Sequence, residues 1–145
     1  MNTATDIFAS AAADGAAWLD EIRDELGWIE RADALHALRA ALHVLRDHLT
    51  PAQNAHLSAQ LPTLVRGIYY EGWRPAAATS AERSLERYLE RIENELGARA
   101  ELDGFDVAQA VYAVLARHVS PGEVAKLQAG LPRQLRVLWE GAGAS

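Results

Sequence analysis

The sequence predicts an all-helical protein, a compact bundle of about eight short helices. Both the spacing of its apolar residues and its composition indicate this fold class. Apolar residues recur at steps of three and four positions, which is the spacing of one face of an α-helix. Ala, Leu, Arg and Glu, all good helix formers, dominate the 145 residues, whereas only 5 prolines and 10 glycines interrupt them. Half of the residues are hydrophobic, which is enough for one well-packed domain of this length.

A third feature is an internal repeat with an offset of 70 positions and no gaps, in which residues 25–27 (Glu-Leu-Gly) match residues 95–97. The same offset pairs further residues of identical type: Val44 with Val114, His48 with His118, Pro51 with Pro121, Leu61 with Leu131 and Pro62 with Pro132. We therefore expect two repeated four-helix units, residues 15–72 and 81–141. Because units of this size rarely bury enough apolar surface alone, we expect a pseudo-symmetric pair that shares one core within a single domain, residues 1–145.

Local signals place the ends of the first helix in each unit. In the first unit this helix is expected over residues 14–26, with Gly27 in the left-handed turn that ends it. Residues 1–13 are expected to form a separate, weak helix. In the second unit, Ser80 is the expected N-cap of the corresponding helix.

The second helix of the first unit carries the clearest pattern, because its leucines form one narrow stripe. They are Leu35, Leu38, Leu42, Leu45 and Leu49. His36 and His43 lie far around the helix from this stripe, and we expect them on a solvated polar face shared with Arg39 and Arg46. A short helix should then begin with a capping box at Thr50, and the second unit repeats that box at Ser120.

Composition excludes several classes of function. The formal net charge is −6 with acids and bases interspersed, so a basic nucleic-acid-binding face is not expected. The absence of cysteine excludes disulfides and thiolate metal sites. The N-terminus does not resemble a signal peptide, and no apolar run approaches the roughly 18 residues of a membrane span, so we expect a cytoplasmic protein without membrane contact.

Motifs for catalysis are missing from the sequence. It contains no nucleophile elbow, phosphate-binding loop, dinucleotide glycine pattern or His-Glu-x-x-His motif. No catalytic residue, cofactor or metal is therefore predicted. A non-enzymatic role is favoured, although enzymatic activity stays open.

Differences between the units mark a first set of candidate residues. Trp28 corresponds to an alanine in the second unit, Tyr70 corresponds to a glutamate, and Trp73 and Arg74 have no similar counterpart before the chain ends. Aromatic residues and arginine are enriched at binding hot spots. These four residues either cover the seam between the units or form an interaction surface for a protein partner or a second copy.

The repeated histidines define a second set. His48 and His118 are both expected at a helix C-terminus, where an imidazole can bond free carbonyl groups and suits the helix dipole. The alternative is that the two imidazoles face each other across the pseudo-axis and bind metal or sense pH. Tyr69 and Trp139, at equivalent positions of the two units, complete this possible site between the repeats.

Two blocks of sequence carry a family resemblance. Residues 59–62 (Ala-Gln-Leu-Pro) and 66–73 (Arg-Gly-Ile-Tyr-Tyr-Glu-Gly-Trp), with the leucine-rich helix before them, resemble the bacterial family called domain of unknown function 2267 (DUF2267). The second half is similar but lacks the Tyr-Glu-Gly-Trp end. The resemblance spans about residues 15–140 and implies a compact helical fold and a bacterial cytoplasmic origin, with no catalytic residues to carry over.

Two functions are therefore expected from the sequence. The first is a non-enzymatic helical protein-interaction or regulatory module, which would use the surface that contains Trp28 and Trp73. The alternative is a protein that binds a small ligand or a metal in a pocket between the repeats.

Overall fold

The computed structural model describes residues 3–77, 79–97 and 101–140, and every regular element in those ranges is a helix. The order is α1 (Thr3–Glu25), α2 (Arg31–Asp47), α3 (Pro51–Ser58), α4 (Thr63–Tyr70), α5 (Leu85–Leu96), α6 (Gly104–His118), α7 (Pro121–Gly130) and a 3₁₀-helix, η1 (Arg133–Trp139). The predicted all-helical class is confirmed. Within these ranges, no helix combines the length and apolar character needed to span a membrane.

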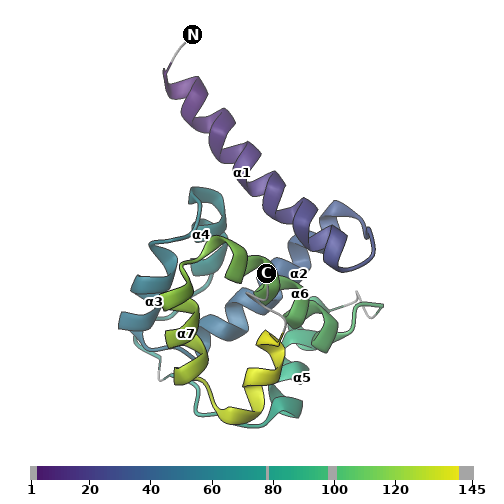
Figure 1. The fold of residues 1–145 in the computed structure, drawn as a ribbon, viewed down its shortest axis with the longest axis vertical. Helices are drawn as coiled ribbons and strands as arrows, with labels where there is room; N and C mark the ends of the chain where they lie inside the picture. The colour runs from purple at the N-terminus through teal and green to yellow at the C-terminus, as the bar shows by residue number, and fades with distance from the viewer. Residues whose placement is uncertain (1–2, 78, 98–100, 141–145) are drawn as a thin grey trace.

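Helix α2 lies in the middle of the bundle and packs against α1, α4, α5 and α6 (Figure 1). Its predicted leucine stripe covers only one side, and alanines on the other sides let neighbouring helices approach closely. They are Ala34, Ala37, Ala40 and Ala41, all buried. The helix is consequently buried almost all round, including its polar residues His43 and Arg46. The expectation that these two residues lie on a solvated face is therefore wrong.

A single cluster of buried residues joins the two halves of the chain, the first with helices α1 to α4 and the second with α5 to η1. Trp18 and Ile22 of α1 belong to it, as do Tyr88 of α5 and Tyr112 of α6. The Tyr112 hydroxyl donates to the carbonyl of Ala41 at 2.9 Å and also bonds the Tyr88 hydroxyl. Three helices are thus tied together inside the core by one phenol.

Aromatic contacts between the halves follow the offset of 70 positions. The His48 ring packs on Tyr88 with centroids 4.8 Å apart, and the His118 ring stacks on Trp18 at 4.7 Å. Each histidine therefore contacts the aromatic residue on the first helix of the opposite half. The predicted repeat stays a prediction, and these contacts are the ones that a pseudo-twofold pair would produce.

Ion pairs between the halves follow the same offset with the charges reversed. Arg91 of α5 binds Asp47 of α2 at 3.0 Å, and Arg117 of α6 binds Glu21 of α1 at 3.3 Å. At the offset of 70 positions Asp47 corresponds to Arg117, and Glu21 corresponds to Arg91. Because the acid and the base are exchanged at both equivalent positions, each ion pair remains attractive. Surface pairs of this kind contribute little to stability, about 0–1 kcal/mol each.

Helix ends agree with the predicted caps in part. The capping box at Thr50 is complete, with Gln53 reaching back to the Thr50 backbone. At the second predicted box, the Ser120 hydroxyl caps α7 as expected, but the Ser120 N–H donates to Gln60 of the first half at 2.7 Å. The N-cap of α5 is Ser84 rather than Ser80.

The first helix differs most from the prediction. It is one continuous helix of 23 residues, so residues 3–13 do not form a separate helix. Gly27 does take the predicted left-handed conformation after the helix, with φ of 81°. Trp28 follows with φ of 62°, which is uncommon for a bulky residue, and its N–H donates to the Arg23 carbonyl.

Replacement of Tyr112 by Phe tests the buried phenol. The Y112F change leaves the Tyr88 hydroxyl and the second acceptor position of the Ala41 carbonyl without a partner, which should lower the free energy of unfolding by about 1–3 kcal/mol. Y88F is the matched control, because it removes one hydroxyl and leaves the bond from Tyr112 to Ala41 in place. Chemical denaturation of both variants should show the larger loss for Y112F, and an equal or smaller loss would contradict the assignment.

Candidate functional site

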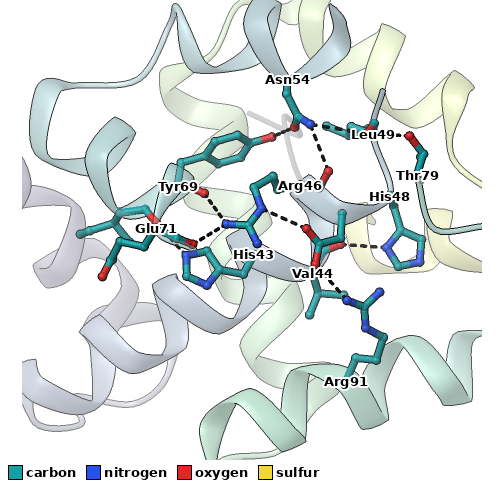
Figure 2. A network of polar contacts seen from close by, with 12 residues as sticks. His43, Val44, Arg46, His48, Leu49, Asn54, Tyr69, Glu71, Thr79 and Arg91 are labelled. Atoms are coloured by element: carbon teal, nitrogen blue, oxygen red, sulfur yellow. Dashed lines mark hydrogen bonds and ion pairs between the residues drawn. The ribbon is translucent and has the colours of Figure 1, made fainter. Parts of the chain in front are cut away.

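The polar network shown in Figure 2 centres on the guanidinium group of Arg46, a side chain on the last turn of α2. Its Nη1 donates to the carbonyls of Tyr69 at 3.0 Å and Glu71 at 2.7 Å, and its Nε donates to Asp47 at 3.0 Å. The residue is only 6% exposed. Since a buried charge is stable only when it is paired and hydrogen-bonded, these partners hold the guanidinium in one position.

Asn54 of α3 closes the network above Arg46 (Figure 2). Its Nδ2 donates to the carbonyls of Arg46 and Leu49, which lie at the end of α2 where helical partners run out. Its Oδ1 accepts the hydroxyl of Tyr69. The pKa of the Tyr69 phenol is raised, chiefly by burial, so Tyr69 is a neutral donor at physiological pH.

The end of α4 is held to α2 by further bonds along the same face. His43 Nε2 donates to the Ile68 carbonyl at 2.7 Å, and Arg39 binds the Glu71 carboxylate at 3.2 Å. The segment that contains residues 66–73 is therefore wrapped over the polar side of α2. This contact gives a structural reason for the block of sequence that carries the family resemblance.

A cavity of about 360 Å³ lies beside Arg46, between the two halves of the chain. The first half contributes the end of α2, the start of α3 and the chain after α4, and the second half contributes α5. The lining residues are Arg46, Asp47, Leu49, Pro51, Gly72, Trp73, Arg74, Pro75, Ala77, Thr79, Ser80, Arg91 and Glu95.

Positive charge gathers at this cavity. Arg46, Arg74 and Arg91 line it, against Asp47 and Glu95. The Asp47 carboxylate is shared, because Oδ1 accepts from Arg46 and Oδ2 accepts from Arg91 at 3.0 Å. Among the described residues, the Nη2 of Arg46 and the whole guanidinium of Arg74 have no hydrogen-bond acceptor.

The structure divides the first set of predicted residues. Trp73 and Arg74 line the cavity, and Tyr70 packs against Trp73 with ring centroids 5.1 Å apart. Trp28 lies elsewhere, 65% exposed on the loop between α1 and α2, where its ring lies over Arg23. That loop and α3 are on opposite sides of the molecule in Figure 1. The four residues therefore do not form one surface.

The second set is also divided. His118 binds Glu21 at 2.7 Å and stacks on Trp18, whereas His48 Nδ1 donates to the Val44 carbonyl at 2.8 Å and packs on Tyr88. Each imidazole has partners of its own, and only His48 bonds a carbonyl at the end of its helix. Among the described residues, no group of three histidines or carboxylates is placed to hold a metal ion.

Tyr69 and Trp139 lie in different surroundings although they are at equivalent positions. Tyr69 is part of the Arg46 network, as described above. The Trp139 ring stacks on Tyr112 with centroids 4.7 Å apart, and its indole Nε1 is buried without a partner among the described residues. Trp139 thus belongs to the core rather than to the cavity.

Sequence reasoning missed Asn54, Asp47 and Arg91 and placed Arg46 in solvent. A usable signal was present, since the offset of 70 positions pairs Arg46 with Ala116 and Asn54 with Val124. Extended from aromatic to polar residues, the comparison between the units marks both positions as specific to the first unit.

His48 makes the stability of the protein depend on pH. Burial lowers the pKa of its imidazole, because the protonated ring would lose hydration and its buried Nε2 has no acceptor among the described residues, whereas the bond from Nδ1 to the Val44 carbonyl opposes this shift. The charged groups that act on the ring are Arg91, which lowers the pKa further, and Asp47 and Glu82, which oppose it. In the unfolded chain the imidazole titrates near 6.5, so the unfolded state binds the proton first as the pH falls.

We expect the unfolding free energy to be highest above the ordinary histidine pKa and to fall by up to about 1.4 kcal/mol per pH unit below it. H48Q should flatten this part of the profile between about pH 7 and about pH 5. H56Q, at an exposed histidine, is the control. Equal slopes for the wild type and H48Q in denaturation at several pH values would contradict the assignment.

Comparison with known proteins agrees with the family resemblance. A comparison with curated proteins found no match. The family model described as "Uncharacterized conserved protein (DUF2267)" matches residues 15–138, a span that includes the Arg46 network, the cavity and both halves of the chain. The chain therefore belongs to the DUF2267 family.

Proposed function

We propose that the protein binds a small organic anion in the cavity between its two halves. The observation that carries this proposal is the Arg46 guanidinium, which is buried at the cavity, fixed by two carbonyls and a carboxylate, and left with one nitrogen free of any partner among the described residues. This Nη2 is accessible from the cavity, because the buried polar side-chain atoms without a partner among the described residues are His48 Nε2 and Trp139 Nε1. An acceptor that enters the cavity would complete its hydrogen bonds.

The charge at the cavity favours an anion. Three arginines outnumber the two carboxylates of the lining, Asp47 and Glu95, and Asp47 is already bound by Arg46 and Arg91. Arg74 adds an exposed, unbonded guanidinium at the rim. A planar guanidinium group can donate two parallel hydrogen bonds to two oxygens of one carboxylate or phosphate group, so the cavity suits either anionic group.

The rest of the lining favours a ligand with a flat or apolar part. Trp73 offers an aromatic ring beside the arginines, and Leu49, Pro51 and Pro75 offer apolar surface. The volume of about 360 Å³ falls within the range of small-molecule sites. A nucleoside monophosphate or an aromatic carboxylate has this combination of groups.

Binding rather than catalysis is proposed, because the polar side chains at the cavity are three arginines, two carboxylates and two hydroxyls that are already hydrogen-bonded. The hydroxyl of Thr79 donates to the Leu49 carbonyl, and that of Ser80 accepts from the Glu82 N–H. Tyr69 has a raised pKa and donates its proton to Asn54, so it does not serve as a base near neutral pH. The expected role is that of a sensor or carrier whose state depends on the ligand.

The proposal predicts that R74A and W73A weaken binding without loss of the fold. Titration calorimetry with a panel of nucleoside monophosphates and aromatic carboxylates should identify a ligand for the wild type. Loss of one charge-assisted hydrogen bond, about 1.5–3 kcal/mol, should then weaken its binding by R74A roughly 10- to 100-fold. At 100 times its Kd the same ligand should stabilise the wild type by about 2.7 kcal/mol.

R133A is the matched control, since Arg133 is exposed at the start of η1 and outside the cavity. Its affinity should equal that of the wild type. Equal losses for R74A and R133A would indicate nonspecific attraction of anions and would overturn the proposal. The same conclusion would follow if no member of the panel bound the wild type.

The protein-interaction module that the sequence analysis expects would use an exposed surface and not this cavity. Trp28 is separated from Trp73, so a surface shared by both is not part of the proposal. The exposed apolar residues of the N-terminal helix offer a separate surface for an interaction.

A further inference from the structure

The first half of α1 extends away from the bundle as an arm (Figure 1). Ile7 and Phe8 on this arm are 62% and 75% exposed, and together with Trp28 and Leu64 they are the large apolar side chains exposed in the described residues. Isolated helices of this length are marginal in water. An arm that exposes its largest apolar side chains therefore indicates a partner.

The apolar stripe of α1 runs without a break from the bundle onto the arm. Positions 8, 12, 15, 19, 22 and 26 alternate in steps of four and three, which keeps them on one face as in a coiled coil. The lower part of this stripe packs on the bundle, with Ile22 fully buried. The upper part, which contains Phe8 and Ala12, is exposed.

An apolar groove of about 320 Å³ lies where the arm joins the bundle. Helices α1, α2 and α4 form it, and its lining residues are Ala12, Gly15, Ala16, Leu19, Arg31, Leu35, Leu38, Leu64, Val65 and Ile68. Gly15 leaves room for the Leu64 side chain, which would lie 3.4 Å from a Cβ at that position. The groove is open and lined by small or aliphatic groups, so it suits one large apolar side chain.

We propose that the occupant of this groove is Phe8 from a second copy of the chain, in a symmetric dimer of antiparallel α1 helices. The separation between Phe8 and Ala16 is eight residues, about 12 Å along the helix. An antiparallel pair centred on Ala12 places Phe8 of each copy beside Ala16 and Gly15 of the other. The Phe8 side chains of both copies are then buried in one interface, and its twofold symmetry limits the assembly to two copies.

Charge favours a second copy over an unrelated apolar helix. The arm carries Asp6 and Asp14 and no basic residue between positions 3 and 14. In the proposed register Asp6 approaches the groove of the other copy near Arg31. Arg31 binds Asp20 through Nη2 and has no acceptor for its other N–H groups among the described residues, so it is able to pair with Asp6 as well.

The oligomeric state in solution tests the proposal. Light scattering coupled to size exclusion, from micromolar to submillimolar protein, should give twice the chain mass for the wild type and the single-chain mass for F8D. W28N is the matched control, because Trp28 is similarly exposed but lies off the arm, and it should stay dimeric. A monomeric wild type over this range overturns the proposal, as does a dimer that F8D leaves intact.

Cross-linking tests the register independently of stability, because the natural chain has no cysteine. A12C places a thiol next to the proposed axis, whereas A13C places it about 100° around the same helix, away from the proposed contact. Under mild oxidation A12C should form disulfide-linked dimers at a rate at least tenfold above that of A13C. Equal rates, or preferential cross-linking of A13C, would exclude the antiparallel pair centred on Ala12.

Discussion

The structure depends on the burial of α2 along nearly its whole circumference. Four helices pack around it, and the alanines on its sides permit their close approach. This arrangement leaves little contact with solvent for His43 and Arg46, which lie on the same helix. Because unpaired buried polar groups destabilise a fold by several kcal/mol, the protein must supply their partners itself. The carbonyls of Ile68, Tyr69 and Glu71 meet that requirement, and they explain the path of the chain at the end of α4.

The cavity follows from the same constraint. Since Arg46 draws the chain after α4 toward the end of α2, the segment that contains Trp73 and Arg74 must turn back across α5. This segment lines the cavity together with Arg46 and Arg91, which both bind Asp47. The second half has an alanine at the position of Arg46 and a valine at the position of Asn54, so it builds no such network. The two halves therefore differ where the proposed ligand would bind.

Periodicity and capping residues predicted most of the fold but little of the candidate site. The caps at Thr50 and Gly27 are local, and the structure has them where the sequence placed them. Ser80 and Ser84 offer similar local signals, so only packing decides between them. Residues 3–13 are rich in alanine and continue into α1 without the helix boundary that the sequence analysis expects before residue 14. The burial of Arg46 depends on which helices cover the second side of α2, and a helical pattern along one segment does not contain that information.

Nuclear magnetic resonance of the arginine side chains tests the central claim, that Arg46 lies at a site for an organic anion. The Nε–H signals of Arg46, Arg74 and Arg91 and the indole signal of Trp73 would be followed during titration with a nucleoside monophosphate at constant ionic strength. Saturable shifts of these four signals, with those of Arg133 and Trp28 unchanged, are the expected result. Shifts of equal size at all arginines, or no saturable shift at Arg46 with any organic anion, would contradict the account.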